Sequence, residues 1–133
     1  MKNLVEEIHG ISPDIRYVAV YRDGTLVSSV KPGLEGASSS ESDKYEELIV
    51  NPALLTLVTQ RGNIDCGGAR FLLVRYGSFF EYVAPVSGGH VSVGIDAKAE
   101  PLKLAAAIQM MIASWSESAL LRVDGHDFPS PPK

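Results

Sequence analysis

The stretch ARFLLVRYGSFFEYVAPV, residues 69–86, is apolar at nearly every position on both sides of Gly77-Ser78. A Gly-Ser pair between two β-rich runs predicts a hairpin with a two-residue turn, in which Leu72 pairs with Val83. A sheet that is open to water on one side alternates apolar with polar residues. Both faces of this hairpin are therefore expected to be covered, and its free edge needs protection.

Composition limits the classes of protein to consider. The 133 residues are 45% hydrophobic, which suits a single domain with a core that needs no disulfide or metal. Twelve basic against sixteen acidic residues give a net charge of −4, without a basic stripe that would neutralise phosphates. We therefore expect no nucleic-acid partner. Cys66 is the single cysteine, which excludes an internal disulfide and indicates a reducing compartment.

Neither the start of the chain nor its apolar segments have a targeting or membrane pattern. Residues 1–10, MKNLVEEIHG, carry acids where a signal peptide has a basic start and an apolar run. The apolar stretch 102–112 is interrupted by Lys103 and Gln109 and is too short to span a membrane. We expect a cytoplasmic protein that does not insert into membranes.

The first part of the chain predicts a short helix and a hairpin. Leu4 and Ile8 have helical spacing before Gly10, a residue common just past a helix end. Residues 15–30, IRYVAVYRDGTLVSSV, form two β-rich runs around Asp23-Gly24, the dipeptide that best suits a type I′ turn. A two-residue loop there predicts the pairing of both runs.

A second helix is predicted after a loop rich in Gly, Ser and Pro, residues 31–42. Its apolar residues keep roughly helical spacing as far as Arg61-Gly62. Asn51-Pro52 falls inside this pattern, where proline removes a backbone hydrogen bond and crowds the preceding turn. The same pair also makes a good helix start. One kinked helix and two helices that meet at Asn51 both satisfy the pattern.

The second part of the chain predicts one more strand and the strongest helix. In residues 88–96, GGHVSVGID, apolar residues alternate with polar ones, which predicts a strand that follows a turn at Gly88-Gly89-His90. From Pro101 onward, apolar residues recur every three or four positions, as in an amphipathic helix. Residues 122–133 are polar and proline-rich and predict a flexible tail after a single domain, residues 1–121.

The order of elements is helix, two strands, helix, three strands, helix. An antiparallel five-stranded sheet with helices on both faces, an αβα three-layer sandwich, accounts for the apolar hairpin. If the first and last strands meet in the middle, the strand over residues 69–76 lies outermost, with Arg70 and Arg75 as its charged residues. Such an edge favours pairing with another chain, and a symmetric dimer is the simplest protection.

Two segments also resemble a known family. They are IRYVAVYRDGTLVSS early in the chain and GARFLLVRYGSFFEYVAPVSGGHVSVGID later, and an Ala-rich final helix follows. Over roughly residues 4–116 this order resembles the roadblock family, which comprises dynein light chains of the roadblock type and small bacterial and archaeal regulators of Ras-like GTPases. The resemblance implies a profilin-like fold and a homodimer formed by pairing third strands and packing second helices.

Carried onto this chain, the resemblance implies a dimer interface made by the third strand and the second helix. The interface residues it implies are Arg70, Phe71, Leu72, Leu73, Val74, Arg75, Tyr76, Tyr45, Leu48 and Leu55. The apolar-edge pattern indicates the same third strand independently.

No residue set predicts an active site, a metal site or a cofactor. His9, His90 and His126 fall in a helix end, a hairpin tip and the tail, without a partner at metal or triad spacing. Cys66 precedes Gly67-Gly68, where nothing marks a base that would activate it. No glycine pattern matches a phosphate-binding loop.

Three functions of different classes follow. The leading hypothesis is a non-enzymatic homodimeric adaptor or regulator that binds a small Ras-like GTPase and modulates its nucleotide cycle, as the resemblance implies. The alternative is a PAS-like sensor module whose apolar interior holds a small molecule. The third is a cysteine-dependent enzyme, which unchanged activity of a Cys66→Ala variant would exclude.

Overall fold

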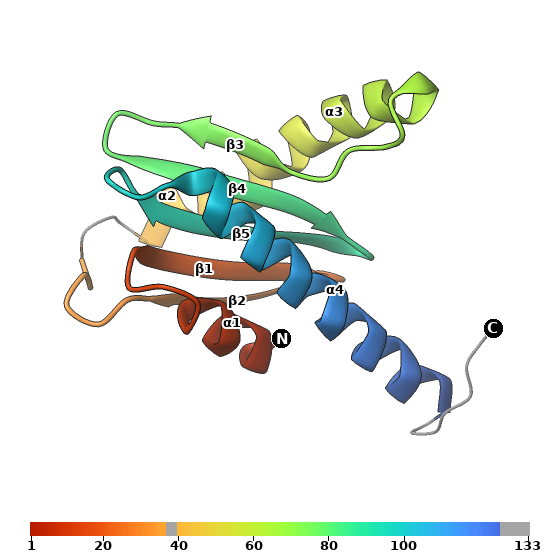
Figure 1. Cartoon of the computed structure of the whole chain (residues 1–133), viewed down its shortest axis with the longest axis horizontal. Coiled ribbons are helices and arrows are strands. Elements are labelled where there is room, and N and C mark those ends of the chain that lie inside the picture. The colour runs from red at the N-terminus through yellow and green to blue at the C-terminus, as the bar shows by residue number, and fades with distance from the viewer. Residues whose placement is uncertain (37–39, 126–133) are drawn as a thin grey trace.

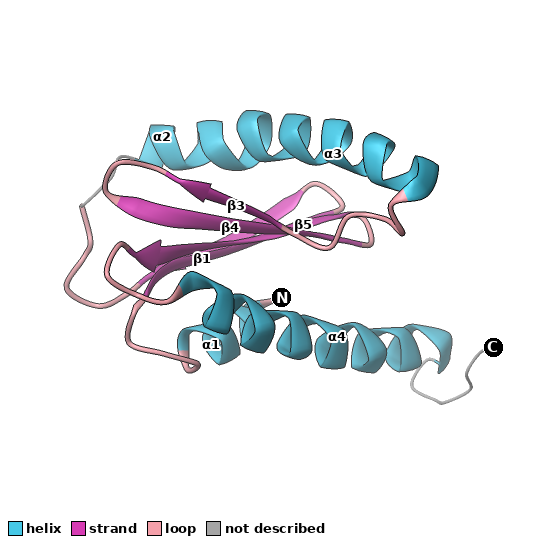
Figure 2. Ribbon diagram, turned by 45° about the horizontal axis from the view of Figure 1, so that its top comes forward, coloured by secondary structure: helices cyan, strands magenta, loops and turns pink. Residues whose placement is uncertain are grey.

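A computed structural model describes residues 1–36 and 40–125 of the chain. The elements are α1 (Lys2–His9), β1 (Ile15–Arg22), β2 (Thr25–Val30), α2 (Ser40–Tyr45), the π-helical segment η1 (Glu46–Val50), α3 (Asn51–Asp65), β3 (Leu72–Arg75), β4 (Phe79–Val86), β5 (Gly89–Asp96) and α4 (Pro101–Gly125). The sheet is antiparallel with the order β2-β1-β5-β4-β3. Figure 2 shows α2 and α3 on one face and α1 and α4 on the other, so the three-layer prediction is confirmed.

The two predicted hairpin turns set the register of their strands. Asp23 and Gly24 have φ values of 51° and 84°, as a type I′ turn requires, and Arg22 pairs with Thr25. The second hairpin pairs Leu72 with Val83, as predicted. Strand β3 is shorter than expected, because it covers only residues 72–75 of the predicted 69–76.

The main core lies between the sheet and the helices α1 and α4. Both helices are amphipathic and bury their apolar stripes against inward-facing β-branched residues of β1 and β5. The fully buried members include Leu4, Ile8, Val18, Val20, Val91, Val93, Ile95, Ala105 and Ile108. Phe71, Leu73 and Phe80 pack against this core from the hairpin, so the α4 face of the hairpin is apolar, as expected.

The helix on the other face is continuous through Pro52 and changes type before it. In η1 the Asn51 N–H donates to the Glu46 carbonyl five residues back, which is a π-type bond. Pro52 has no N–H to donate to the Leu48 carbonyl, and the wider π turn lies where this hydrogen bond is missing. Helix α3 then runs from Asn51 to Asp65. The structure therefore contains neither a sharp kink nor two separate helices. It has one helix with a π turn.

Strand β3 is an edge of the sheet, as the hairpin pattern predicts, and β2 is the opposite edge (Figure 1). Helix α4 crosses the sheet diagonally and extends to Gly125, so residues 122–125, expected in the tail, are helical. The rest of the predicted tail, including His126, lies outside the described residues. Among the residues described, no helix is long and apolar enough to cross a membrane.

Candidate functional site

The backbone of β3 presents hydrogen-bonding groups to the outside of the sheet. The Tyr76 N–H donates to the Phe79 carbonyl at 2.9 Å, which makes this pair hydrogen-bonded. Because such pairs alternate along an antiparallel ladder, Val74 also directs its N–H and C=O toward β4. Leu73 and Arg75 then direct theirs away from β4, toward the free edge. This edge is a template on which another strand can pair.

The side chains that flank this edge are held in place within the chain. Phe71 stacks on Tyr82 with ring centroids 5.3 Å apart, and the Arg75 guanidinium lies 5.0 Å from the Phe80 ring centroid. Arg75 also donates to the carbonyls of Tyr76 and Gly77. The Arg75 guanidinium is therefore folded back on the hairpin, and its charge does not block the edge.

The helix formed by α2, η1 and α3, on the face of the sheet opposite α4, exposes several large apolar residues. Of the seven large hydrophobic residues exposed among the described positions, five lie on this helix. They are Tyr45, Leu48, Ile49, Leu57 and Ile64, with exposures between 43% and 75%. Ile49, Leu57 and Ile64 recur at helical spacing and form a stripe, which we call the outer helix stripe.

The structure places the helix residues of the expected interface on different sides. Tyr45 and Leu48 are exposed, whereas Leu55 is only 8% exposed and packs inward. The expected contact of Leu55 with a partner stays a prediction, and within one chain Leu57 is the exposed leucine of α3, at 65%.

A buried polar network lies under the π turn. Glu47, on η1, accepts hydrogen bonds from Ser92 Oγ at 2.6 Å and from Asn51 Nδ2 at 3.1 Å, and its Oε1 lies 2.8 Å from His90 Nε2. Glu81 on β4 completes the group, with its Oε2 3.5 Å from Asn51 Nδ2. All five side chains are at most 2% exposed.

This network corrects one expectation from the sequence. His90 does not lie at a solvated hairpin tip, because it is buried beside Glu47 and Tyr21. Glu81, the one acid within residues 69–86, is buried opposite Val74 of β3. The signal was present in the alternation of β5, where His90 and Ser92 alternate with valines, a pattern that also fits a solvated face.

A cavity of about 570 Å³ opens beside the network, between the helix and the sheet. We call it the helix–sheet cavity. It is lined by residues of both hairpins, α2 and η1, among them Tyr17, Tyr45, Glu46, Glu47, Tyr76 and Glu81. The Tyr76 hydroxyl donates to Glu46 at 3.1 Å, which ties the β3–β4 turn to η1 across the cavity.

Burial and crowding of acids control protonation in this region. Burial, followed by the charges of Glu47 and Glu46, raises the pKa of Glu81 to about 9, so this carboxyl is protonated at neutral pH. Burial also raises the pKa of Glu46. The pKa of the Tyr17 hydroxyl is raised above its ordinary value by burial and then by the carboxylate of Glu47. Acidic side chains crowd this region, and burial favours their protonated forms.

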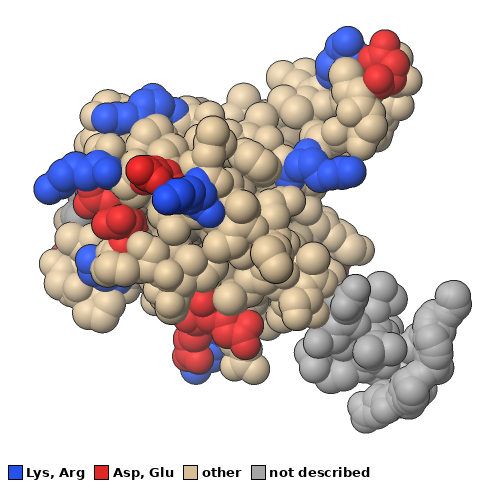
Figure 3. Space-filling view, viewed as in Figure 1, with Lys and Arg blue, Asp and Glu red and all other residues tan. Residues whose placement is uncertain are grey.

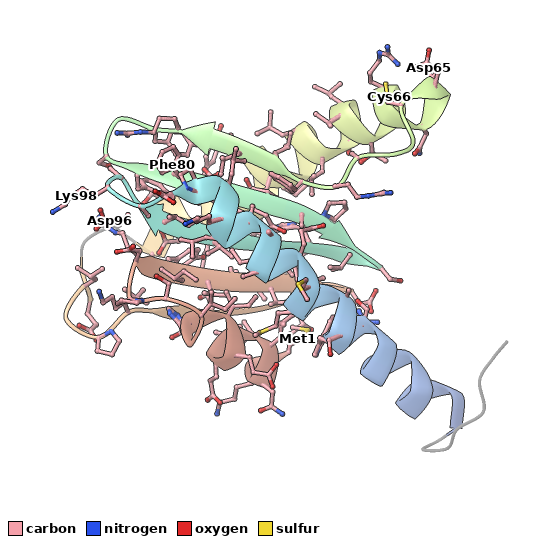
Figure 4. All side chains as sticks on the ribbon, in the orientation of Figure 1. Met1, Asp65, Cys66, Phe80, Asp96 and Lys98 are labelled. Carbon is pink, nitrogen blue, oxygen red and sulfur yellow. The ribbon has the colours of Figure 1, made fainter. Side chains whose placement is uncertain are left out.

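The remaining candidate residues do not assemble into a site. Cys66 is exposed at the far end of α3, where its sulfur contacts the Asp65 carboxylate at 3.4 Å (Figure 4). His9 contacts the Ser29 carbonyl at 3.0 Å. No three His, Cys, Asp or Glu side chains in the described part of the chain are grouped so that they could hold a metal ion. On the face shown in Figure 3, Lys and Arg side chains are scattered singly.

Comparisons with known proteins agree with this architecture. Neither family models nor curated proteins give a match to the sequence. Among solved structures, the chain is similar to a Roadblock/LC7 domain from Streptomyces avermitilis, with a TM-score of 0.68 and 17% identity over 90% of this chain and 97% of that one. It is also similar to MglC from Myxococcus xanthus, with a TM-score of 0.60 and 12% identity over 88% and 97% of the two chains. The chain therefore has the fold of a roadblock/LC7 domain.

Proposed function

We propose that this chain is a homodimeric, non-enzymatic adaptor that binds a small Ras-like GTPase and modulates its nucleotide cycle in the cytoplasm. The observation that carries the proposal is the combination of the roadblock/LC7 fold with an open, apolar edge at β3. The resemblance of the sequence to the roadblock family is the reason to propose a GTPase as the partner. The β3 edge and the outer helix stripe are the surfaces proposed for binding.

The dimer uses β3 and the helix beside it. Two copies that pair β3 antiparallel satisfy the outward N–H and C=O groups of Leu73 and Arg75. The same two-fold axis brings the helices of both copies together, and the outer helix stripe, with Leu48 and Tyr45, loses its contact with water. Exposed apolar residues gathered on one element mark an interaction surface rather than a random scatter.

The GTPase is modulated without a catalytic residue from this chain. An adaptor that binds one arrangement of the GTPase switch loops more tightly than the other shifts their population by that difference in affinity. The chain then needs shape and surface complementarity, which its apolar surfaces supply. Cys66 contacts the Asp65 carboxylate, whose negative charge disfavours a thiolate, so its surroundings do not favour a cysteine enzyme.

The dimer is tested with a matched set of proline variants measured by light scattering. Arg75→Pro removes an N–H that points to the free edge, so we expect a folded monomer. Arg75→Ala keeps that N–H and should remain dimeric, which separates the backbone effect from loss of the guanidinium. Val74→Pro removes an N–H that points to β4 and should unfold the hairpin. A wild-type protein that is monomeric at micromolar concentration would contradict the interface.

The GTPase is tested by affinity capture from a lysate of the source organism with GTP or GDP added. Nucleotide-dependent retention of a Ras-like GTPase, lost in Arg75→Pro, supports an adaptor that works as a dimer. Retention of no GTPase in either nucleotide state contradicts this part of the proposal and leaves the dimer result intact.

Ligand sensing is the second candidate, and the helix–sheet cavity is the observation that favours it. The sequence led us to expect an apolar interior for a sensor. The cavity is instead lined by acids and aromatic rings, so its ligand must match them.

A further inference from the structure

The helix–sheet cavity has the size and position of a ligand site. Its volume of about 570 Å³ falls within the range of about 300–1,000 Å³ found for small-molecule pockets. Its walls come from elements far apart in the sequence, with Tyr17 on β1, Glu46 on η1, Tyr76 beside β3 and Glu81 on β4. Both hairpins and the helix therefore fix its shape.

Acids outnumber bases in the lining of the cavity. Asp43, Glu46, Glu47 and Glu81 line it, and Arg16 is the one Lys or Arg among its lining residues. Within the described parts of the chain, none of the three glutamates forms an ion pair with a lysine or arginine. Of the three, Glu47 pairs with His90. A cation bound in the cavity would give Glu46 and Glu81 a charged partner.

Polar atoms beside the cavity are poorly partnered. The Asn51 Oδ1 atom is buried without a hydrogen bond in the described structure, and the buried Tyr17 hydroxyl has the Glu47 carboxylate nearby, without the geometry of a good hydrogen bond. Glu81 is 2% exposed, and its contact from Asn51 Nδ2 is 3.5 Å long, against about 2.7–3.2 Å for a good N–H···O bond. Poorly paired buried groups are destabilising, and a ligand that carries several N–H donors would give the Glu81 carboxylate the hydrogen bonds it lacks.

The other walls of the cavity are aromatic and aliphatic. The rings of Tyr17, Tyr45, Tyr76 and Phe79 line it together with Val50. Aromatic faces attract cations, and the apolar surface suits a hydrocarbon body. A metal ion does not fit this lining, because the described acids and histidines are not grouped as ligands for one. An ammonium group on an apolar body matches both halves of the cavity.

We propose that the helix–sheet cavity binds a small organic amine, with its ammonium group between Glu46 and Glu81 and its apolar body against the tyrosine rings. The ammonium group donates hydrogen bonds to both carboxylates. It takes the place of the proton that Glu81 otherwise holds. This site does not depend on the GTPase proposal, because the cavity lies within one chain.

The proposal is tested with 2-phenylethylamine by two-dimensional NMR titration and isothermal titration calorimetry. We expect saturable amide shifts centred on Tyr17 and Gly94 and a dissociation constant of about 1 mM or lower. 2-Phenylethanol, which has the same ring without the charge, should bind at least about tenfold more weakly. Equal binding of the two compounds would overturn the proposal, as would the absence of saturable shifts.

Variants of Glu46 and Glu81 test whether these two carboxylates contact the ammonium group. Glu81→Gln and Glu46→Gln should each weaken binding of the amine about tenfold or more and leave binding of 2-phenylethanol unchanged. Glu46 is half-buried, so its variant keeps the test valid if Glu81→Gln folds poorly. Glu100→Gln, an exposed acid on the other face of the sheet, is the matched control and should bind like wild type. Wild-type affinity in both cavity variants overturns the assignment.

Binding also displaces a proton from the cavity. Calorimetry in two buffers of different ionisation enthalpy should show that amine binding at neutral pH releases up to one proton per chain. The charged or titratable groups facing Glu81 are Asp43, Glu46, Glu47, His90, Tyr17, Tyr76 and Arg16. The release should disappear in Glu81→Gln, and release that persists there would contradict the role of Glu81.

Discussion

The substitution Glu81→Gln should abolish most of the dependence of stability on pH. Burial and neighbouring acids raise the pKa of Glu81 to about 9 in the folded protein, against about 4.3 in an unfolded chain. Between these two values, the folded protein binds more protons at this carboxyl than the unfolded chain does. The free energy of unfolding therefore falls as pH rises through this window.

The size of the effect follows from the proton count. One proton of difference changes the free energy of unfolding by about 1.4 kcal/mol per pH unit. From about pH 5 to about pH 8 the Glu81 carboxyl alone removes about 4 kcal/mol, when a small domain has about 5–15 kcal/mol in total. Burial raises the pKa of Glu46 as well, which acts in the same direction. Glutamine at position 81 has nearly the same shape as glutamate but does not titrate, so the variant should lose this dependence on pH.

Urea unfolding at several pH values measures this linkage. Trp115 is the single tryptophan, is half-buried and has the Arg22 guanidinium 5.3 Å from its ring centroid, so its fluorescence should report unfolding. Protein concentration must be held fixed, because dimerisation shifts apparent stability. Glu7→Gln, an exposed acid on α1, is the control and should follow the wild type.

The comparison of slopes decides the outcome. We expect the wild type to lose stability steeply between about pH 5 and about pH 8, and Glu81→Gln to lose much less. If Glu81→Gln loses stability as steeply as the wild type, another group carries the linkage and the reasoning is refuted.

Three further substitutions test a close backbone contact, a buried hydrogen bond and the exposed surface of α3. Gly62→Ala should destabilise the protein by about 1–3 kcal/mol in urea unfolding, because a Cβ there lies 3.0 Å from the Gly68 carbonyl carbon; an unchanged midpoint would contradict the close approach. Ser92→Ala should cost about 1.5–3 kcal/mol, because it removes a 2.6 Å bond to the buried Glu47 carboxylate, and thermal unfolding checks this. Leu57→Glu should leave unfolding by urea of the monomer nearly unchanged and weaken dimerisation in light scattering; unaltered dimer mass would remove the outer helix stripe from the interface.

The hairpins and the exposed edge were predictable because their signals are local. Asp23-Gly24 specifies a turn with positive φ at both positions, and that turn fixes the register of β1 and β2. The nearly continuous apolar pattern of residues 69–86 likewise indicated a hairpin covered on both faces and an edge strand that is open to pairing. These inferences needed no knowledge of distant contacts.

The buried network was not predictable in the same way, since its contacts are remote in sequence. Glu47 and His90 are 43 positions apart. In the sequence, a place in the first turn of a helix explains Glu47 and a place at a hairpin tip explains His90, so nothing indicates that they meet. Leu48 and Leu55 are seven residues apart and would share a face of a regular α-helix. The π turn between them adds a residue and rotates one relative to the other, so Leu48 is exposed and Leu55 is buried.

The sheet order has a consequence for how the chain folds. The two outer parts of the sheet, β1–β2 and β3–β4–β5, are built from neighbouring segments, whereas β1 and β5 join residues as distant as Ile15 and Ile95. Closing this central seam costs the most chain entropy, so we expect it to form after the hairpins and to limit the folding rate. Substitutions at Val18 or Val93 in the seam should slow folding, while substitutions on the β3 edge should mainly accelerate unfolding.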